Sequence, residues 1–148
     1  MPLPVGERAP DFQIKPGLKL SDLGKPAVIY FYPKDDTPGC TIEAKEFQQQ
    51  YFEISRTGAE VLGISTDDET SHAAFCDKYG LTFPLVPDAN KSISTDYEVL
   101  LAEKGYAGRV TFLVDGEGYI RKVWDPVNPT GHALELVDAI RAMGRGEF

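Results

Sequence analysis

Cys40 is the residue whose type and surroundings point most clearly to chemistry, and it is one of only two cysteines in the chain. It closes the segment YPKDDTPGC, residues 32–40, which lies between an apolar, strand-like run and a helix-like run. We therefore expect the thiol at or near a helix N-terminus, where unpaired backbone N–H groups and the helix dipole favour an anion. Because the thiolate is the reactive form of cysteine, the segment predicts a nucleophile in an activating position.

The residues around Cys40 carry a resemblance to a known family. Pro33, Thr37 and Cys40 form the pattern Pro-x-x-x-Thr-x-x-Cys, which resembles the signature of peroxiredoxins. The fuller segment resembles the peroxiredoxin Q branch, also called bacterioferritin comigratory protein, and so do VGERAPDF, KYGLTFPL and RVTFLVD at residues 5–12, 78–85 and 109–115. The resemblance covers nearly the whole chain. It implies a thiol-dependent peroxidase that reduces hydrogen peroxide and organic hydroperoxides, needs no cofactor or metal, and is re-reduced by a thioredoxin-type donor.

The resemblance also implies roles for the residues of the site. A peroxidase must keep its sulfur ionised, align the peroxide and stabilise charge on the leaving oxygen. By resemblance, the Thr37 hydroxyl and the backbone N–H groups of Gly39 and Cys40 bind the peroxide. The Arg109 guanidinium stabilises thiolate and oxyanion and stays charged at any working pH, while Pro33 covers the thiolate.

Simpler interpretations of these residues stay open. Glu43 belongs by resemblance to the hydrogen-bond network of the site, but in the first helical turn it could simply favour the dipole. Thr37 could be an ordinary turn residue, and Arg109 an ordinary surface arginine. Asp35 and Asp36 would oppose ionisation of a nearby thiol, so we expect both carboxylates to point into solvent.

Cys76 is the only other thiol, and its role has two interpretations. In the commoner form of the branch, a resolving cysteine lies five residues after the first, where this chain has Lys45. A less common form places it in the following helix, so the resemblance implies that oxidised Cys40 condenses with Cys76. Alternatively, Cys76 is a small buried apolar residue and the protein is a one-cysteine peroxidase. Since a disulfide needs Cα atoms about 4.4–6.8 Å apart, two cysteines on separate helices would require local unwinding or a shift.

Alternating strand and helix patterns predict the elements that position these residues. Continuous apolar runs at 27–32 and 61–65 fit buried strands of a parallel sheet. We expect an α/β protein with a thioredoxin-like fold, a central mixed β-sheet flanked by helices and an N-terminal β-hairpin, as one domain over residues 1–148. The expected elements are a hairpin at 12–20, helices at 40–56, 69–79 and 92–97, a hairpin of strands at 110–114 and 119–124, and a last helix capped by Thr130.

Composition excludes several other classes of function. The formal net charge of -8 argues against nucleic-acid binding and against anionic membranes. Neither a membrane-length apolar run nor a signal peptide is visible, so we expect a cytoplasmic protein, by resemblance a monomer or weak homodimer. His72, His132 and the two cysteines lack the spacing of a zinc site. A general thiol–disulfide oxidoreductase is a further alternative, although no Cys-x-x-Cys is present, and a binding module that kept the fold is another.

Overall fold

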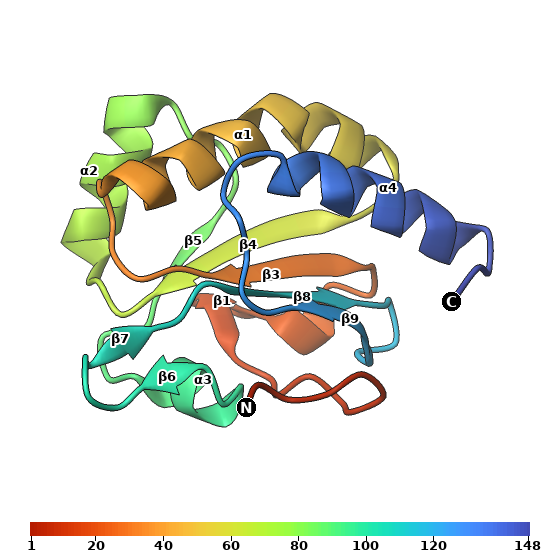
Figure 1. Ribbon diagram of the computed structural model, residues 1–148, viewed down its shortest axis with the longest axis horizontal. Coiled ribbons are helices and arrows are strands. Elements are labelled where there is room, and N and C mark those ends of the chain that lie inside the picture. Colours follow the sequence, from red (N-terminus) through yellow and green to blue (C-terminus); the bar gives the residue numbers. More distant parts are fainter.

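A mixed five-stranded sheet forms the centre of the computed structural model, which describes residues 1–148 (Figure 1). Three strands run parallel, and two further strands are antiparallel to their neighbours. The strands stand in the order β5-β4-β3-β8-β9, with bounds Leu85–Pro87, Glu60–Ser65, Ala27–Phe31, Val110–Val114 and Ile120–Trp124. The expected α/β class with a mixed sheet is confirmed.

Two apolar layers cover the two faces of this sheet. Along β3, the side chains alternate between them: Val28 and Tyr30 join one buried cluster, while Ile29 and Phe31 join the other. In Figure 1, the helices above the sheet are α1 (Pro38–Arg56), α2 (Glu69–Tyr79) and α4 (His132–Gly144). The elements below it are the hairpin β1–β2 (Gln13–Lys15 and Leu18–Lys19), η1 (Leu20–Asp22), α3 (Ser92–Asp96) and the strands β6–β7 (Leu100–Leu101 and Tyr106–Ala107).

Local sequence explains where the two helices that carry cysteines begin and end. Helix α1 begins at Pro38, two residues earlier than expected, because proline at the first helical position has a suitable φ and lacks only an N–H that would be unpaired. Helix α2 is capped by Asp68, whose carboxylate accepts the Ser71 N–H at 2.8 Å. It stops at Gly80, which takes a left-handed φ of 65°.

Two other expectations need correction or addition. Thr130 does not cap the last helix: α4 begins at His132 and its N-cap is Gly131, with a left-handed φ of 83° that favours glycine. The Gly131 N–H instead donates to Glu46 Oε1 at 2.7 Å. The two-stranded ribbon β6–β7 was not predicted, because each of its strands has only two residues. No helix of the protein has the length and apolar character needed to cross a membrane.

Candidate active site

Cys40 lies in the first turn of α1, next to the carboxyl end of the central strand β3. The thiol residue is buried, with 1% of its surface exposed. The first backbone hydrogen bond of the helix runs from the Thr41 N–H to the Thr37 carbonyl, at 2.8 Å. The N–H groups of Gly39 and Cys40 precede it and have no intrahelical acceptor. The expected placement of the thiol at a helix N-terminus is therefore confirmed.

An arginine from a distant part of the chain lies over this first turn. Arg109 directly precedes β8, and β8 pairs with β3, so the sheet brings the guanidinium to the start of α1. Its Nη1 donates to Glu43 Oε1 at 2.9 Å. Its Nη2 lies 3.0 Å from the point that a Cβ on Gly39 would occupy, so a side chain there would press on the guanidinium. Burial lowers the pKa of Arg109, but Cys40 and Glu43 together raise it above its usual value.

Glu43 is buried beside the thiol in a mainly apolar setting. Its Oε2 has no hydrogen-bond partner. Burial raises the pKa of this carboxyl group from 4.5 to about 7, although Arg109 acts in the opposite direction. Nearby, burial is also the main reason why the pKa of the Tyr30 hydroxyl lies well above its usual value, with Glu43 and Cys40 adding to the effect. Burial at this site therefore opposes negative charge on the Glu43 carboxyl group and on the Tyr30 hydroxyl, and Arg109 offsets only part of that effect at Glu43.

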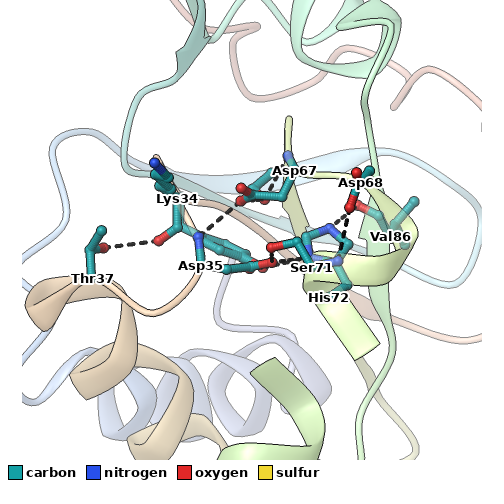
Figure 2. Close-up of polar contacts among 10 residues, drawn as sticks. Lys34, Asp35, Thr37, Asp67, Asp68, Ser71, His72 and Val86 are labelled. Carbon is teal, nitrogen blue, oxygen red and sulfur yellow. Dashed lines mark hydrogen bonds and ion pairs between the residues drawn. The ribbon is translucent and has the colours of Figure 1, made fainter. Parts of the chain in front are cut away.

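The other two residues predicted from the motif lie in the loop before α1. The Thr37 hydroxyl donates to the Lys34 carbonyl at 2.9 Å rather than capping the helix (Figure 2). Because that bond uses the only proton of the hydroxyl, its oxygen is left as an acceptor. Pro33 is half-buried and follows β3 by two residues.

Cys76 lies on α2, in the same apolar layer as Cys40. It is partly buried and packs against the cluster that contains Cys40, and both cysteines are free thiols. Burial, and then the Asp35 carboxylate, raise the pKa of the Cys76 thiol. In this conformation Cys76 is accordingly a protonated, packed side chain rather than a ready nucleophile.

Known proteins match most of this chain. The family model described as the AhpC/TSA family matches residues 5–123. The chain belongs to the AhpC/TSA family. A putative peroxiredoxin bcp of Coxiella burnetii is 43% identical over 148 residues, covering 93% of this chain and 98% of the relative. These matches make the protein a peroxiredoxin and a thiol-dependent peroxidase.

Solved structures of peroxiredoxins share the fold. A Xylella fastidiosa PrxQ variant is 31% identical with a TM-score of 0.86, covering 96% of this chain and 98% of that one. Two variants of Xanthomonas campestris peroxiredoxin Q are each 38% identical with a TM-score of 0.76, covering 81% of this chain and 80% of theirs. Each of these two carries serine at a different cysteine, and the two positions are as far apart as Cys40 and Cys76 are here. The expected thioredoxin-like fold is thus confirmed.

One expectation about the peroxiredoxin's loop was wrong. Asp36 is exposed, but Asp35 is buried, because its carboxylate accepts hydrogen bonds from Tyr32, Ser71 and His72. No local pattern links Asp35 to His72, which lies 37 residues further along the chain. A usable signal did exist: β3 and β4 are parallel, so the residues that follow them meet at the same edge of the sheet.

The same edge of the sheet holds a group of three potential metal ligands at close range. Ligand atoms of Asp35, Asp67 and His72 lie within 4.8 Å of one another. Their oxygens already accept hydrogen bonds from within the protein; Asp67 Oδ2, for example, accepts from the Ser65 hydroxyl and from the Asp35 N–H. A metal ion would have to displace these donors, so the cluster is better described as a hydrogen-bond network.

Proposed function

We propose that this peroxiredoxin reduces hydrogen peroxide and organic hydroperoxides by a two-cysteine cycle, with Cys40 as peroxidatic and Cys76 as resolving residue. The observation that carries the peroxidatic assignment is the buried Cys40 in the first turn of α1, with Arg109 over that turn and paired to Glu43. An organic substrate is supported by one structure of the Xanthomonas campestris protein, whose description names alkyl peroxide reduction activity.

The first step breaks the O–O bond. The Cys40 thiolate attacks the hydroxyl oxygen of the peroxide, forms an S–O bond and becomes a sulfenic acid. The other oxygen leaves as alkoxide or hydroxide and takes a proton from water. We assign Arg109 and the free N–H groups of Gly39 and Cys40 to the developing negative charge. Thr37 accepts a hydrogen bond from the peroxide O–H, and Pro33 limits access of water.

The second step forms a disulfide. Cys76 attacks the sulfur of the sulfenic acid, so that water leaves and an intramolecular disulfide joins α1 to α2. The matching cysteine separation in the Xanthomonas variants supports this assignment. Because Cys76 is partly buried on a different helix, we infer that α2 unwinds locally, which local stability differences in proteins permit. A thioredoxin-type dithiol then reduces the disulfide, and we infer that the cycle runs in the reducing cytoplasm.

Mass measurement after one equivalent of hydrogen peroxide tests both assignments. The reduced protein is oxidised, its remaining thiols are blocked under denaturing conditions, and its intact mass and peptides are recorded. We expect a loss of about 2 Da and one peptide pair cross-linked through Cys40 and Cys76. Cys76→Ser is the matched variant, and it should instead gain about 16 Da at Cys40.

Two results would contradict the proposal at different points. A gain of oxygen at Cys40 in the wild-type protein, with Cys76 recovered as a free thiol, would leave a one-cysteine peroxidase. That outcome would fit the packing of Cys76 against the apolar core. An unchanged Cys40 after exposure to peroxide would remove the peroxidatic assignment altogether.

A further inference from the structure

A buried ion pair lies beside the site, and the reaction scheme above does not use it. The Asp35 side chain is 4% exposed, as is the side chain of its partner His72. Asp35 Oδ1 accepts a hydrogen bond from the Tyr32 hydroxyl at 2.6 Å. Its Oδ2 accepts one from the Ser71 hydroxyl and lies 2.7 Å from His72 Nδ1 (Figure 2). A buried carboxylate surrounded by three donors is stabilised in its ionised form.

Both ring nitrogens of His72 face hydrogen-bond acceptors. Its Nε2 lies 3.1 Å from the Val86 carbonyl, which can only accept, so Nε2 carries a proton. Its Nδ1 faces the Asp35 carboxylate, which also accepts, so Nδ1 carries a second proton. Both contacts are satisfied together when His72 is an imidazolium paired with the Asp35 carboxylate. In agreement, burial raises the pKa of Asp35, but the hydrogen bonds, led by that from His72, bring it below its usual value.

The pair fixes one peptide unit in the loop that leads to Cys40. The Asp35 N–H donates to Asp67 Oδ2 at 2.9 Å, and the Asp35 side chain is held by α2. The peptide bond is planar, so these contacts also fix the Lys34 carbonyl on the other side of the same unit. That carbonyl accepts the Thr37 hydroxyl at 2.9 Å, as Figure 2 shows. A continuous chain of contacts thus runs from His72 to Thr37.

Asp36 adds a second, exposed contact between the loop and the same helix. Its backbone has a left-handed φ of 57°, which is unfavourable for a residue with a Cβ. Its carboxylate accepts from Lys78 Nζ at 2.8 Å and from the Tyr79 hydroxyl at 2.6 Å. Cys76 lies between the two places at which α2 holds the loop, so the buried contact at His72 can persist while the later turns of α2 unwind.

We propose that the Asp35–His72 ion pair is a positioning element for peroxide attack, which fixes the Lys34–Asp35 peptide and thereby directs the Thr37 hydroxyl at the start of α1. This proposal rests on the proposed role of Thr37 in binding the peroxide. Neither Asp35 nor His72 touches the reacting atoms; both act through the carbonyl that Thr37 contacts.

A double-mutant cycle on the full chain tests this proposal. The rate of Cys40 oxidation by hydrogen peroxide is measured by rapid mixing for Asp35→Ala, His72→Ala, Thr37→Val and the combined Asp35→Ala/Thr37→Val protein. Misplacing a group that binds the peroxide should slow oxidation by on the order of 10- to 100-fold in each single variant. Because Asp35 acts through Thr37, the combined variant should oxidise only slightly more slowly than Thr37→Val alone. The proposal would be overturned if the fold-losses in rate of the two single variants multiplied in the combined variant, or if the single variants kept the wild-type rate.

Two controls separate positioning from loss of stability. Asp88→Asn alters another buried carboxylate, which accepts from Ile93 and Ser94 on α3 and not from the loop, so it should retain the wild-type oxidation rate. Asp35→Asn keeps a hydrogen-bonding group next to His72, because its amide can donate to Nδ1 of a neutral ring, and it should restore part of the rate lost in Asp35→Ala. An Asp88→Asn rate as low as that of Asp35→Ala would overturn the proposal.

Nitrogen-15 NMR of the imidazole ring tests the ion pair without any disruptive variant. In the reduced wild-type protein at neutral pH, we expect both ring nitrogens of His72 to be protonated, and in Asp35→Asn only Nε2. A neutral ring in the wild type would overturn the proposal even if the alanine variants failed to fold. A wild-type protein that failed to reduce peroxide would contradict the proposed function as well as this inference. Variants that kept the wild-type rate would contradict this inference alone.

Discussion

At the scale of single residues, Glu43 is a carboxyl group whose charge opposes folding. Its pKa is about 7 in the folded protein and 4.5 when unperturbed, because burial disfavours the carboxylate. Because the folded protein binds this proton more tightly than the unfolded chain, protonated Glu43 stabilises the fold fully below pH 4.5. That stabilisation is lost as the pH rises through about 7. By this linkage, the loss amounts to about 3 kcal/mol.

Glu43→Gln should therefore change the pH dependence of unfolding. Relative to the wild type, the variant should gain about 3 kcal/mol of stability between pH 4.5 and about 7, and no more above that range. Urea unfolding of the reduced proteins at several pH values measures this difference. The exposed Glu103→Gln serves as a matched control and should follow the wild type. If the difference in unfolding free energy between the wild type and Glu43→Gln stayed constant over pH, Glu43 would ionise in the folded protein without penalty.

At the scale of elements, the packing of α1 on the sheet depends on one residue without a side chain. Gly63 lies in β4 opposite Tyr30 of β3. A Cβ there would lie 2.9 Å from the Tyr30 ring and 2.7 Å from Leu85 Cδ2. Tyr30 stacks on Phe47 of α1 with ring centroids 4.6 Å apart, so it has little room to move.

Gly63→Ala should therefore destabilise the protein by about 1–3 kcal/mol, the usual cost of overpacking a core. The measurement is urea unfolding, and the midpoint should fall with little change in slope. Gly144→Ala is the matched control: it lies in α4 with open space around the added methyl group, and alanine favours a helix. Stability equal to the wild type in Gly63→Ala would mean that Tyr30 and Leu85 yield freely.

The elements differ in how far local sequence could predict them. Strands β3 and β4 are continuous apolar runs, and α2 has both a capping Asp68 and a terminal Gly80, so pattern and local chemistry agreed with the fold. Cys40 and Arg109 were assigned to one site by resemblance, and the pairing of β8 with β3 explains why they meet. The burial of Asp35 was missed because it depends on His72, a contact made only when α2 packs beside the loop. The reactive residues could thus be identified from the sequence, whereas the long-range contacts that support them could be seen only in the structure.

At the scale of the whole molecule, the sheet and the helices should respond differently to oxidation. Strand β3 is buried on both faces and belongs to both apolar clusters. Exchange of its amide hydrogens therefore requires the whole core to open. Cys40 and Cys76 lie instead on separate helices, near the start of α1 and in the later turns of α2. We therefore expect the proposed disulfide to form by movement in those turns and not in the sheet.

Hydrogen exchange should therefore divide the oxidised molecule into two parts. Compared with the reduced protein, amide protection should fall in the first turns of α1 and after His72 in α2, and stay unchanged in β3, β4 and β8. The early turn of α2, held through Asp35, should keep its protection. Cys76→Ser treated with peroxide controls for oxidation of Cys40 alone and should resemble the reduced wild type. Equal protection of both helices in the two redox states would mean that the cysteines join without unwinding. Loss of protection in the sheet would mean that oxidation also changes the structure of the core.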